Sequence, residues 1–509
     1  MSAVTASPVS ETRSAEPKRG LITISIMLAT IMQALDTTIA NVALPNMQGT
    51  LSATQEQISW VLTSYIVAAA IMMPMTGFLA ARFGRKRLFL WSVAGFTLTS
   101  MLCGAATSLP ELVLFRLLQG IFGAALVPLS QSVLLDTYPR EQHGSAMAMW
   151  GVGVMVGPIL GPTLGGYLTE YYNWRWVFFI NLPFGLMALA GIFAFVSETP
   201  KDNSRRFDLF GFAVLSLAVG AMQMLLDRGQ SLDWFSSPEI LVEAVMVVLF
   251  AYLFLVQMFT AKHPFIEPGL FLDRNFSVGL IFIFLIGIIL LATMALLPPF
   301  LQGLMGYPVL DTGMVLAPRG VGTMVSMMVV GRLSGKVDTR LMITLGLLFT
   351  SLSLWQMTAF TTEVSELTLV YTGIVQGLGL GLIFVPLSTI TFATLAPRYR
   401  NEGTAMFSLL RNLGSSIGIS WMMTLLSRNT QVNHAVLSEQ VTPFSQALEQ
   451  VSSWDPTTVQ GLIAINDQVT RQALTIAYLQ DFRVMMWVTL AALPLVLLLK
   501  APAKVKMQS

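Results

Sequence analysis

The chain has 509 residues, of which 54% are hydrophobic and only 11% are charged, and its mean hydropathy is +0.69. These values exclude a string of ordinary soluble domains. Apolar runs of about 18 residues or more follow one another along nearly the whole sequence, and each is long enough to cross a membrane as a helix. The sequence therefore predicts an all-α, polytopic membrane protein and not a β-barrel.

Metal and nucleotide sites are not predicted. The only cysteine, Cys103, excludes an intramolecular disulfide and a cysteine-based metal centre. The three histidines, His143, His263 and His434, lie far apart in the sequence. The segment GRLSGKV from Gly331 has the wrong glycine spacing for a phosphate-binding P-loop and no hydroxyl residue after its lysine. We therefore expect no cofactor, no metal and no nucleic-acid partner.

The first helix is predicted near residues 21–44, directly after a polar segment that ends in Lys18 and Arg19. This apolar span is too long for a signal-peptide core and lacks a cleavage site, so we expect it to be retained. Hydropathy and helix-breaking residues predict fourteen helices in all. The others lie near 57–79, 87–106, 110–134, 145–168, 174–197, 208–227, 239–260, 275–301, 311–333, 340–361, 367–392, 404–427 and 483–500.

The lysines and arginines predict the orientation, because positively charged loops stay in the cytoplasm. With the N-terminus inside, alternate loops place most of the 29 Lys and Arg residues on the inner side. The exceptions are Arg175, Arg228, Arg428, Arg471 and Arg483 outside, and Arg116, Arg319 and Arg411 within helices. This bias supports an even number of helices with both termini in the cytoplasm.

The chain also contains a duplication. With an offset of about 254 to 259 residues, short motifs recur in the same order. VPLS occurs at Val127 and again at Val385, and PREQHGSAM from Pro139 matches PRYRNEGTAM from Pro397. Two homologous six-helix halves separated by two extra helices account for fourteen. Parallel repeats of this kind are typical of transporters, with the site between the halves near mid-membrane.

The predicted organisation divides the chain into four parts. These are a cytoplasmic tail (1–20), an N-terminal six-helix bundle (21–200), two linker helices (201–265) and a C-terminal six-helix bundle (266–509), the last including an outer loop (428–481) and a short cytoplasmic tail.

Asp36 lies about midway along the first predicted helix, where a charge is costly and therefore usually functional or paired. Gln33, Asp36, Thr37 and Asn41 share one face at helical spacing, and we predict that this face lines a cavity. A carboxylate there can take up a proton or hold a cation. The alternative is a structural aspartate that pairs with a neighbouring helix.

Three arginines lie inside predicted helices. Arginine stays charged, so each needs a carboxylate, carbonyl groups or water nearby. We predict that Arg116 favours the deprotonated form of Asp36 or of another acid, with a purely structural role as the alternative. Arg411 shares a face with serines and an asparagine and is predicted to line a cavity. Arg319 follows a proline and can instead extend toward a membrane interface.

The predicted fifth helix carries a glycine every four residues, with prolines in between. Small residues at this spacing let helices approach closely, and prolines bend a helix, so the face is predicted to act as a hinge where the halves meet. Tight packing without motion explains the spacing equally well. The residues are Gly153, Gly157, Pro158, Gly161, Pro162 and Gly165.

A short basic loop, RFGRKR, joins the second and third predicted helices. Positive-inside topology explains its charge. Its glycines at fixed offsets, with a weaker copy at Gly331, favour an added gating role, and the predicted gating residues are Gly77, Arg82, Gly84 and Arg85. Asp208, at the start of DLFG, is predicted to cap the N-terminus of a helix.

Six motifs together resemble the major facilitator superfamily, and within it the fourteen-helix drug/proton antiporters of the EmrB/QacA type, with the EmrB branch most similar. The resemblance covers nearly the whole chain. The motifs are LDTTIANVALP from Leu35, GFLAARFGRKR from Gly77, RLLQGIFGA from Arg116, GPILGPTLGG from Gly157, WRWVFFINLPFG from Trp174 and DLFG from Asp208.

The resemblance implies a proton-driven exporter of hydrophobic drugs in the bacterial inner membrane. It also implies a periplasmic adaptor of the EmrA type and an outer-membrane channel as partners, besides membrane lipid. In the family, the arginine at Arg116 is linked to proton coupling and the glycine pattern marks antiporters. The family's inner loop usually reads GxLADRxGRR. Here Ala81 replaces the aspartate, so no salt bridge is expected from that position.

The outer stretch from Arg428 to Asp481 is by far the longest predicted loop and is polar with few charges. Recurring apolar residues, such as Val436 and Val441, predict short amphipathic helices. We expect this stretch either to dock the adaptor or to cap the outer opening.

Three other functional classes compete with a proton-driven drug exporter. A channel or uniporter would continue to transport without a proton gradient. An enzyme or a receptor would need a catalytic constellation or a large soluble domain, and the sequence predicts neither. A narrow-substrate exporter of a metabolite or siderophore stays open. The methionines and aromatic residues of the helices suit varied apolar drugs.

Overall fold

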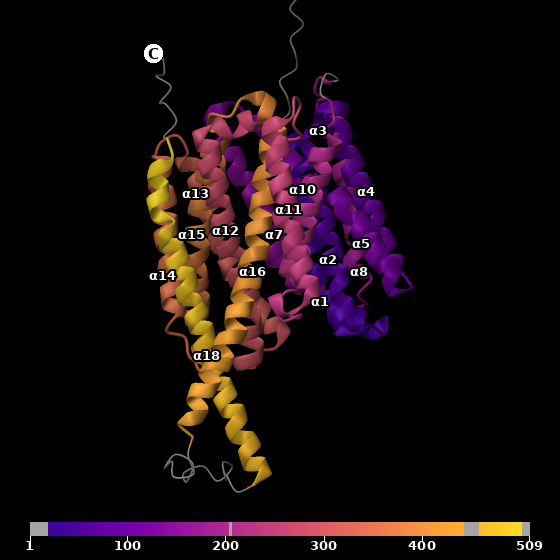
Figure 1. The fold of residues 1–509 in the computed structure, drawn as a ribbon. Helices are drawn as coiled ribbons and strands as arrows, with labels where there is room; N and C mark the ends of the chain where they lie inside the picture. Colours follow the sequence, from indigo (N-terminus) through magenta and orange to yellow (C-terminus); the bar gives the residue numbers. More distant parts are fainter. Residues whose placement is uncertain (1–18, 203–205, 442–457, 501–509) are drawn as a thin grey trace, which may run out of the picture.

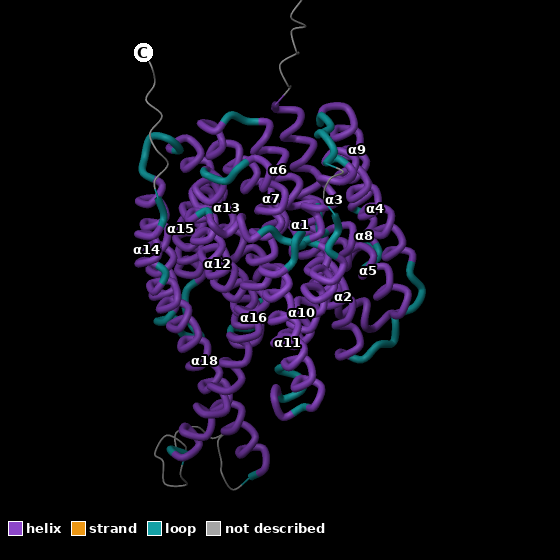
Figure 2. The backbone as a smooth tube through the Cα atoms, turned by 45° about the horizontal axis from the view of Figure 1, so that its top comes forward, coloured by secondary structure: helices purple, strands orange, loops and turns teal. Residues whose placement is uncertain are grey.

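The structure is a computed structural model, and it describes residues 19–202, 206–441 and 458–500. All regular secondary structure in these residues is helical, and short loops join most of the helices (Figures 1 and 2). In the first half, the helices are α1 (Arg19–Thr50), α2 (Gln55–Met72), α3 (Met75–Phe83), α4 (Arg85–Ala105), α5 (Leu109–Gly123), α6 (Leu126–Thr137), α7 (His143–Tyr171), α8 (Trp176–Phe179) and α9 (Asn181–Phe195).

Two helices without a counterpart in the duplication follow the first half, and the second half comes after them. The extra pair is α10 (Leu209–Arg228) and α11 (Pro238–Thr260). The second half contains α12 (Arg274–Pro299), α13 (Val309–Leu333), α14 (Thr339–Met357), α15 (Glu366–Ala393), α16 (Arg400–Glu439) and α18 (Val459–Ala491). Each of the fourteen predicted helices therefore corresponds to one helix or to one broken helix.

Length and composition alone identify fewer membrane crossings than predicted helices. Within the described residues, 12 helices are long and apolar enough to cross a membrane, or 13 if the bent pair α2 and α3 is one span. The pair is bent by 59° next to Pro74, which lacks a backbone N–H donor. Polar residues keep α16 out of this set, although it packs against α12 and α18. Fourteen transmembrane helices thus stay a prediction.

Side-chain caps fix several helix starts. Thr54 and Gln57 form a reciprocal capping box at the start of α2. Asp208 accepts a hydrogen bond from the backbone N–H of Gly211 at 2.9 Å, so its predicted role as an N-cap is confirmed. The same carboxylate also accepts hydrogen bonds from Gln257 and from the backbone of Phe265, which ties α10 to α11 and to the chain that follows.

The two halves repeat the same helix pairs. The pairs α1–α7, α2–α5, α4–α5 and α4–α9 recur as α12–α16, α13–α15, α14–α15 and α14–α18. Close approaches recur as well: Gly120 lies against the backbone of Tyr65, and Gly377 lies against the backbone of Arg319. This equivalence confirms the two pseudo-symmetric halves. The halves meet where α7 packs against α13 and where α16 packs against α6 and α3.

The long outer loop predicted between the last two helices is mostly helical extension. The helix α16 continues to Glu439, and α18 begins at Val459, 24 residues before the predicted start at residue 483. At about 1.5 Å per residue, a helix of 40 residues is about 60 Å long, twice the hydrocarbon thickness. Both helices accordingly extend beyond the rest of the bundle (Figure 1).

The expectation of separate short amphipathic helices is therefore wrong for residues 428–439 and 459–481, which we call the α16–α18 hairpin. Residues 442–457, which include the predicted apolar positions Phe444 and Leu448, lie outside the described residues. Asn433 of α16 donates hydrogen bonds to Gln480 and to the Ala473 carbonyl of α18, which holds the two helices together.

Candidate functional site

Asp36 and Arg116 meet inside the first half, as the sequence predicts. Arg116 Nη1 lies 2.7 Å from Asp36 Oδ2, and both side chains are 1% exposed. The other carboxylate oxygen, Oδ1, accepts hydrogen bonds from Gln119 Nε2 at 2.8 Å and from Asn181 Nδ2 at 2.9 Å. We call these four residues the Asp36 cluster. It joins α1, α5 and α9, so the charge of Asp36 affects three helices at once.

The guanidinium of Arg116 has further partners that hold it in place. Its Nε donates to the Val61 carbonyl of α2 at 3.1 Å, and Nη1 also donates to Gln119 Oε1 at 2.8 Å. The ring of Tyr65 lies beneath it, with 4.4 Å from Cζ to the ring centroid. Lysine lacks this planar fork of donors, so charge alone would not reproduce the arrangement.

Sequence reasoning missed part of the Asp36 cluster. Asn181 is fully buried at the start of α9 and also donates to Ser100 Oγ of α4 at 2.9 Å. Its signal was available, because it stands inside the motif WRWVFFINLPFG, but an uncharged asparagine does not stand out there. Tyr65 likewise carries no sequence signal that ties it to Arg116.

The other polar residues predicted on the Asp36 face have smaller roles in the geometry. Gln33 is half-buried and donates to the Tyr65 hydroxyl at 3.3 Å, so it touches the cluster through one intermediate. Asn41 is exposed and donates to the Thr37 carbonyl of its own helix. Gln33 therefore reaches the Asp36 cluster only through Tyr65, whose ring lies against Arg116.

The structure does not bring Arg411 or Arg319 to an acid of the described residues. Arg411 is half-buried on α16, and no ion pair or hydrogen bond joins its side chain to another described residue. Arg319 is 8% exposed, and its Nη2 donates to the Leu290 carbonyl at 3.3 Å. Arg319 therefore does not extend to an interface as its alternative reading suggests. It lies inside the bundle.

The duplication explains where Arg319 points. At the offset of the repeat, Leu290 corresponds to Asp36 and Arg319 corresponds to Tyr65. The second half thus keeps a buried arginine at the equivalent place, but on a different helix and facing a carbonyl group instead of a carboxylate. The second half also buries a carboxylate on another helix: Asp481 of α18 is fully buried, and neither carboxylate oxygen has a hydrogen-bond partner in the described residues.

The glycine face of α7 packs against α1 and not against the other half. A Cβ added at Gly157 would lie 2.5 Å from the Ala34 carbonyl carbon, and one at Gly161 would lie 2.1 Å from Thr38 Oγ1. Thr38 also donates to the Gly157 carbonyl. The expected location of this face between the halves is therefore wrong.

The other members of the glycine motif have the same partner. Gly153 faces Met27, Gly165 faces Ile39, and Pro158 and Pro162 lie between these glycines within α7. The opposite face of α7 contacts α13, where Gly320 lies against Ile159 and Gly331 against Ala148. In the second half, Gly414 and Gly418 of α16 repeat the motif against α12. A hinge function of these residues stays a prediction.

The basic loop lies at the end of the bundle where α1 begins and where the described part of the chain ends (Figure 1), and it takes part in a contact between the halves. Arg85 forms an ion pair with Asp136 at the end of α6, and Arg400 of α16 binds the same carboxylate. Ser132 Oγ donates to Asn401 Oδ1 at 2.5 Å. We call Arg85, Asp136 and Arg400 the Asp136 cluster. It joins the two halves at this end.

Two glycines of the predicted gating motif, Gly84 in the loop and Gly77 in α3, are required by their surroundings. Gly84 has a φ of 92°, a conformation that favours glycine, and a Cβ there would lie 2.5 Å from Glu198 Oε1. Glu198 instead accepts hydrogen bonds from the backbone N–H groups of Lys86 and Arg87. A Cβ at Gly77 would lie 3.0 Å from the Cα of Glu402 on α16. Arg82 is exposed at the end of α3, and Ala81 offers only its carbonyl, which accepts from the Asp202 N–H.

Residues 26–419 match the family model of the Major Facilitator Superfamily. The chain is 36% identical over 488 residues to Multidrug export protein EmrB of Escherichia coli K12, covering 95% of each chain. The chain belongs to the major facilitator superfamily. It is 35% identical to Fatty acid resistance protein FarB of Neisseria gonorrhoeae, covering 94% of this chain and 96% of FarB. It is thus an EmrB-like membrane transporter and not an enzyme.

A solved structure supports the fold. The human organic anion transporter MFSD10 (TETRAN) superposes with a TM-score of 0.60, over 93% of this chain and all of that protein. The sequence identity is only 14%, so this likeness concerns the fold alone.

Proposed function

We propose that this protein is a multidrug exporter of the bacterial inner membrane that exchanges protons for hydrophobic or amphipathic drugs by alternating access. The observation that carries the proposal is the buried Asp36–Arg116 ion pair at the centre of the first half of a transporter fold. The names of its relatives, Multidrug export protein EmrB and EmrY among them, support drugs as the substrate class.

In the proposed mechanism, a proton and a cationic drug compete for the carboxylate of Asp36. Arg116 is permanently charged and stabilises the ionised carboxylate, so a proton can bind only when this ion pair loosens. A cationic drug in the cavity competes with Arg116 for the same carboxylate. Either event changes the contacts of Asp36 and so shifts α1, the helix that carries it. Helix α7 packs against α1 and also contacts α13 of the other half, so it can pass this shift on. This chain of contacts links the acid to the surface between the halves.

The decisive experiment measures transport in inverted membrane vesicles that contain the protein. A panel of fluorescent drugs should enter the vesicles when the pH gradient is present, and uptake should stop when a protonophore collapses the gradient. Uptake that persists with the protonophore would identify an uncoupled facilitator. The variant Asp481→Asn belongs in the same series, because Asp481 supplies a second buried carboxyl group, in the other half.

A narrower substrate range is the second candidate. One relative at 35% identity is named for resistance to fatty acids, so fatty acids should be included beside the dyes. Transport of one chemical class alone, whether fatty acids, a metabolite or a siderophore, would replace the multidrug reading while leaving the proton-coupled mechanism in place.

Alternating access predicts that the contact around Asp136 must open during each cycle. The substitutions Ser132→Cys and Asn401→Cys place two thiols where the oxygens now lie 2.5 Å apart. The native Cys103 is buried on α4 and should not interfere. Oxidation should therefore cross-link the halves and stop vesicle transport, and a reductant should restore it. Full transport by the cross-linked protein would show that this end stays closed throughout the cycle. Each single-cysteine variant serves as the control.

We further propose that the α16–α18 hairpin docks an EmrA-like periplasmic adaptor, which connects the exporter to an outer-membrane channel. The hairpin extends past the other helices and carries exposed apolar side chains. On α16 these are Val432 and Val436, each 54% exposed, and on α18 they include Leu462 and Ile463. Exposed apolar residues outside the membrane are typical of a protein interface.

This docking predicts different outcomes in vesicles and in cells. Val436→Lys combined with Ile463→Lys should leave vesicle transport unchanged, because neither side chain lies in the bundle. The same variant should lower drug resistance of whole cells by about tenfold and weaken cross-linking to the adaptor. Exposed residues at the opposite end provide the control, for example Leu209→Lys. Equal loss of vesicle transport would place the hairpin in the transport pathway, and unchanged cross-linking would exclude it as the docking surface.

A further inference from the structure

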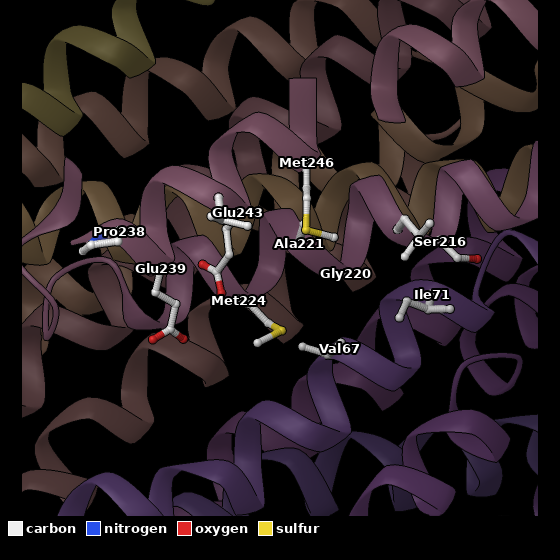
Figure 3. Close-up of a pocket in the computed structure, with 12 residues that line it drawn as sticks. Val67, Ile71, Ser216, Gly220, Ala221, Met224, Pro238, Glu239, Glu243 and Met246 are labelled. Atoms are coloured by element: carbon white, nitrogen blue, oxygen red, sulfur yellow. The ribbon is translucent and has the colours of Figure 1, made fainter. Parts of the chain in front are cut away.

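The two extra helices form a groove with α2 that the proposed mechanism does not use. The groove has a volume of about 640 Å³ and lies between α2, α10 and α11 (Figure 3). Its walls are mostly apolar, and Gly220 lets α10 approach Ile71 of α2 closely. The lining residues include Val67, Ile71, Leu217, Met224, Val242 and Met246.

One carboxylate in this apolar groove lacks a complete set of partners. Glu243 of α11 is only 7% exposed, and its Oε2 atom is buried without a hydrogen bond from any described residue. Figure 3 shows its carboxylate close to Met224 of α10. Burying a carboxylate oxygen among methionine and valine side chains is costly unless a donor or a cation reaches it.

The charges around the groove leave an excess of acid. Glu239, one turn earlier on α11, forms an ion pair with Arg228. Asp227 accepts a hydrogen bond from Thr63 of α2. The guanidinium of Arg228 also lies over the ring of Trp60, 5.6 Å from its centroid. Among the described residues, a single arginine, Arg228, acts on three carboxyl groups: Asp227, Glu239 and Glu243. This excess of acid means that the groove attracts a cation.

The groove is accessible from the membrane. Two apolar residues that line it, Val242 of α11 and Leu217 of α10, are 59% and 43% exposed, so the groove opens on the outer surface of these helices, which are apolar enough to span a membrane. Glu243 lies five residues after the start of α11 at Pro238, about 7 Å along the helix. On the orientation predicted from the arginines and lysines, this depth corresponds to the outer leaflet. A ligand can therefore reach the carboxylate from the bilayer without crossing water.

We infer that the α2–α10–α11 groove binds a hydrophobic cation from the membrane, an amphipathic amine whose ammonium group pairs with Glu243 while its apolar part fills the groove. This inference builds on the proposed export of amphipathic drugs and assigns a role to the two helices that the duplication does not explain. The same chemistry has two sources in a bacterial membrane, namely a cationic drug and the amine headgroup of phosphatidylethanolamine. Both present an ammonium group next to apolar chains.

The test is photolabelling of the purified full-length transporter in nanodiscs of phosphatidylglycerol. The probe is a long-chain alkylammonium that carries a diazirine in its alkyl chain, and mass spectrometry locates the labelled peptides. In the native protein, labels should appear in α10, α11 and the adjacent part of α2. Glu243→Gln should lower this labelling at least fivefold. Val242→Trp, which fills the groove without changing its charge, should do the same.

Matched controls make the result specific. Glu170→Gln removes an exposed carboxylate at the end of α7, outside the groove, so its labelling should stay near the native level. Asp36→Asn should also keep the labelling, because the measurement needs no proton gradient, and failure of the proposed proton coupling therefore leaves this test intact. Native labelling by Glu243→Gln, or equal labelling by a neutral probe of the same length, would overturn the inference. If phosphatidylethanolamine added to the nanodiscs suppresses labelling, the occupant in cells is the lipid amine. If it does not, the groove is available to drugs.

Discussion

Asp36→Asn should abolish proton-driven efflux, with drug uptake into inverted vesicles lowered at least about tenfold at unchanged expression. Asparagine keeps the size of the side chain and can still accept a hydrogen bond from Gln119, but it cannot take up or release a proton. Arg116 then faces no charge, so the coupling between protonation and the position of α1 is lost. The measurement is the initial rate of dye uptake under an imposed pH gradient.

Loss of transport by this variant alone has a second explanation, which needs a control. Removing one partner of a buried ion pair leaves the other charge unpaired, at a typical cost of about 3–5 kcal/mol in the free energy of unfolding. The double variant Asp36→Asn with Arg116→Gln removes both charges and should recover most of the thermal stability. It should still fail to couple drug uptake to the pH gradient. Normal coupling in the double variant would remove Asp36 as the coupling acid.

Charged residues within apolar helices were the part of the site that the sequence could predict. Asp36 and Arg116 stand out because a charge in the membrane is rare, and their partnership follows from the need to neutralise it. The duplication and the positions of the helices were predictable for a similar reason, since both depend on long apolar runs and repeated motifs. Asp208 at the start of α10 shows that local capping can also be read from neighbouring residues.

Residues that depend on which helices are neighbours were not predictable. Asn181 and Tyr65 belong to α9 and α2, and only the packing of these helices around α5 brings them to Asp36 and Arg116. Asp481 was assigned to the edge of a loop, because polar residues follow one another before it and hide the continuous helix α18. Periodicity likewise identified the glycine face of α7, but it could not say that the facing helix is α1.

The two halves therefore share a fold but not a charge arrangement. In the first half, acid and arginine neutralise each other directly across α1 and α5. In the second half, Arg319 faces a backbone carbonyl, and Asp481 is buried on α18 without a hydrogen bond from the described residues. The recurring glycine contacts show that the backbone packing was kept after the duplication, whereas the charged groups have diverged. This asymmetry fits the proposed antiport, in which one half holds a closed ion pair and the other supplies buried charges without an ionic partner.

Gly157→Leu should stop transport, because it acts on the contact that connects the Asp36 cluster to α7. Even a Cβ at this position would lie 2.5 Å from the Ala34 carbonyl carbon, and a backbone atom cannot rotate away as a side-chain tip can. Helix α1 would be displaced, and Asp36, two residues further along, would move with it. The 2.7 Å contact to Arg116 would then be lost, so we expect at least about tenfold slower uptake with a modest loss of stability, about 1–3 kcal/mol.

Gly166→Leu provides the matched control, since it introduces the same side chain on the same helix. Apart from the neighbouring backbone of its own helix, no atom lies within 4 Å of a Cβ at Gly166, so this variant should fold and transport normally. Both variants should be compared by thermal unfolding in detergent, by drug binding and by uptake into vesicles. If the Gly157 effect is confined to folding, binding and uptake will fall together. If the close approach of α1 and α7 transmits motion, binding will persist while uptake is lost. Equal transport by the two variants would show that this approach is not needed for the cycle.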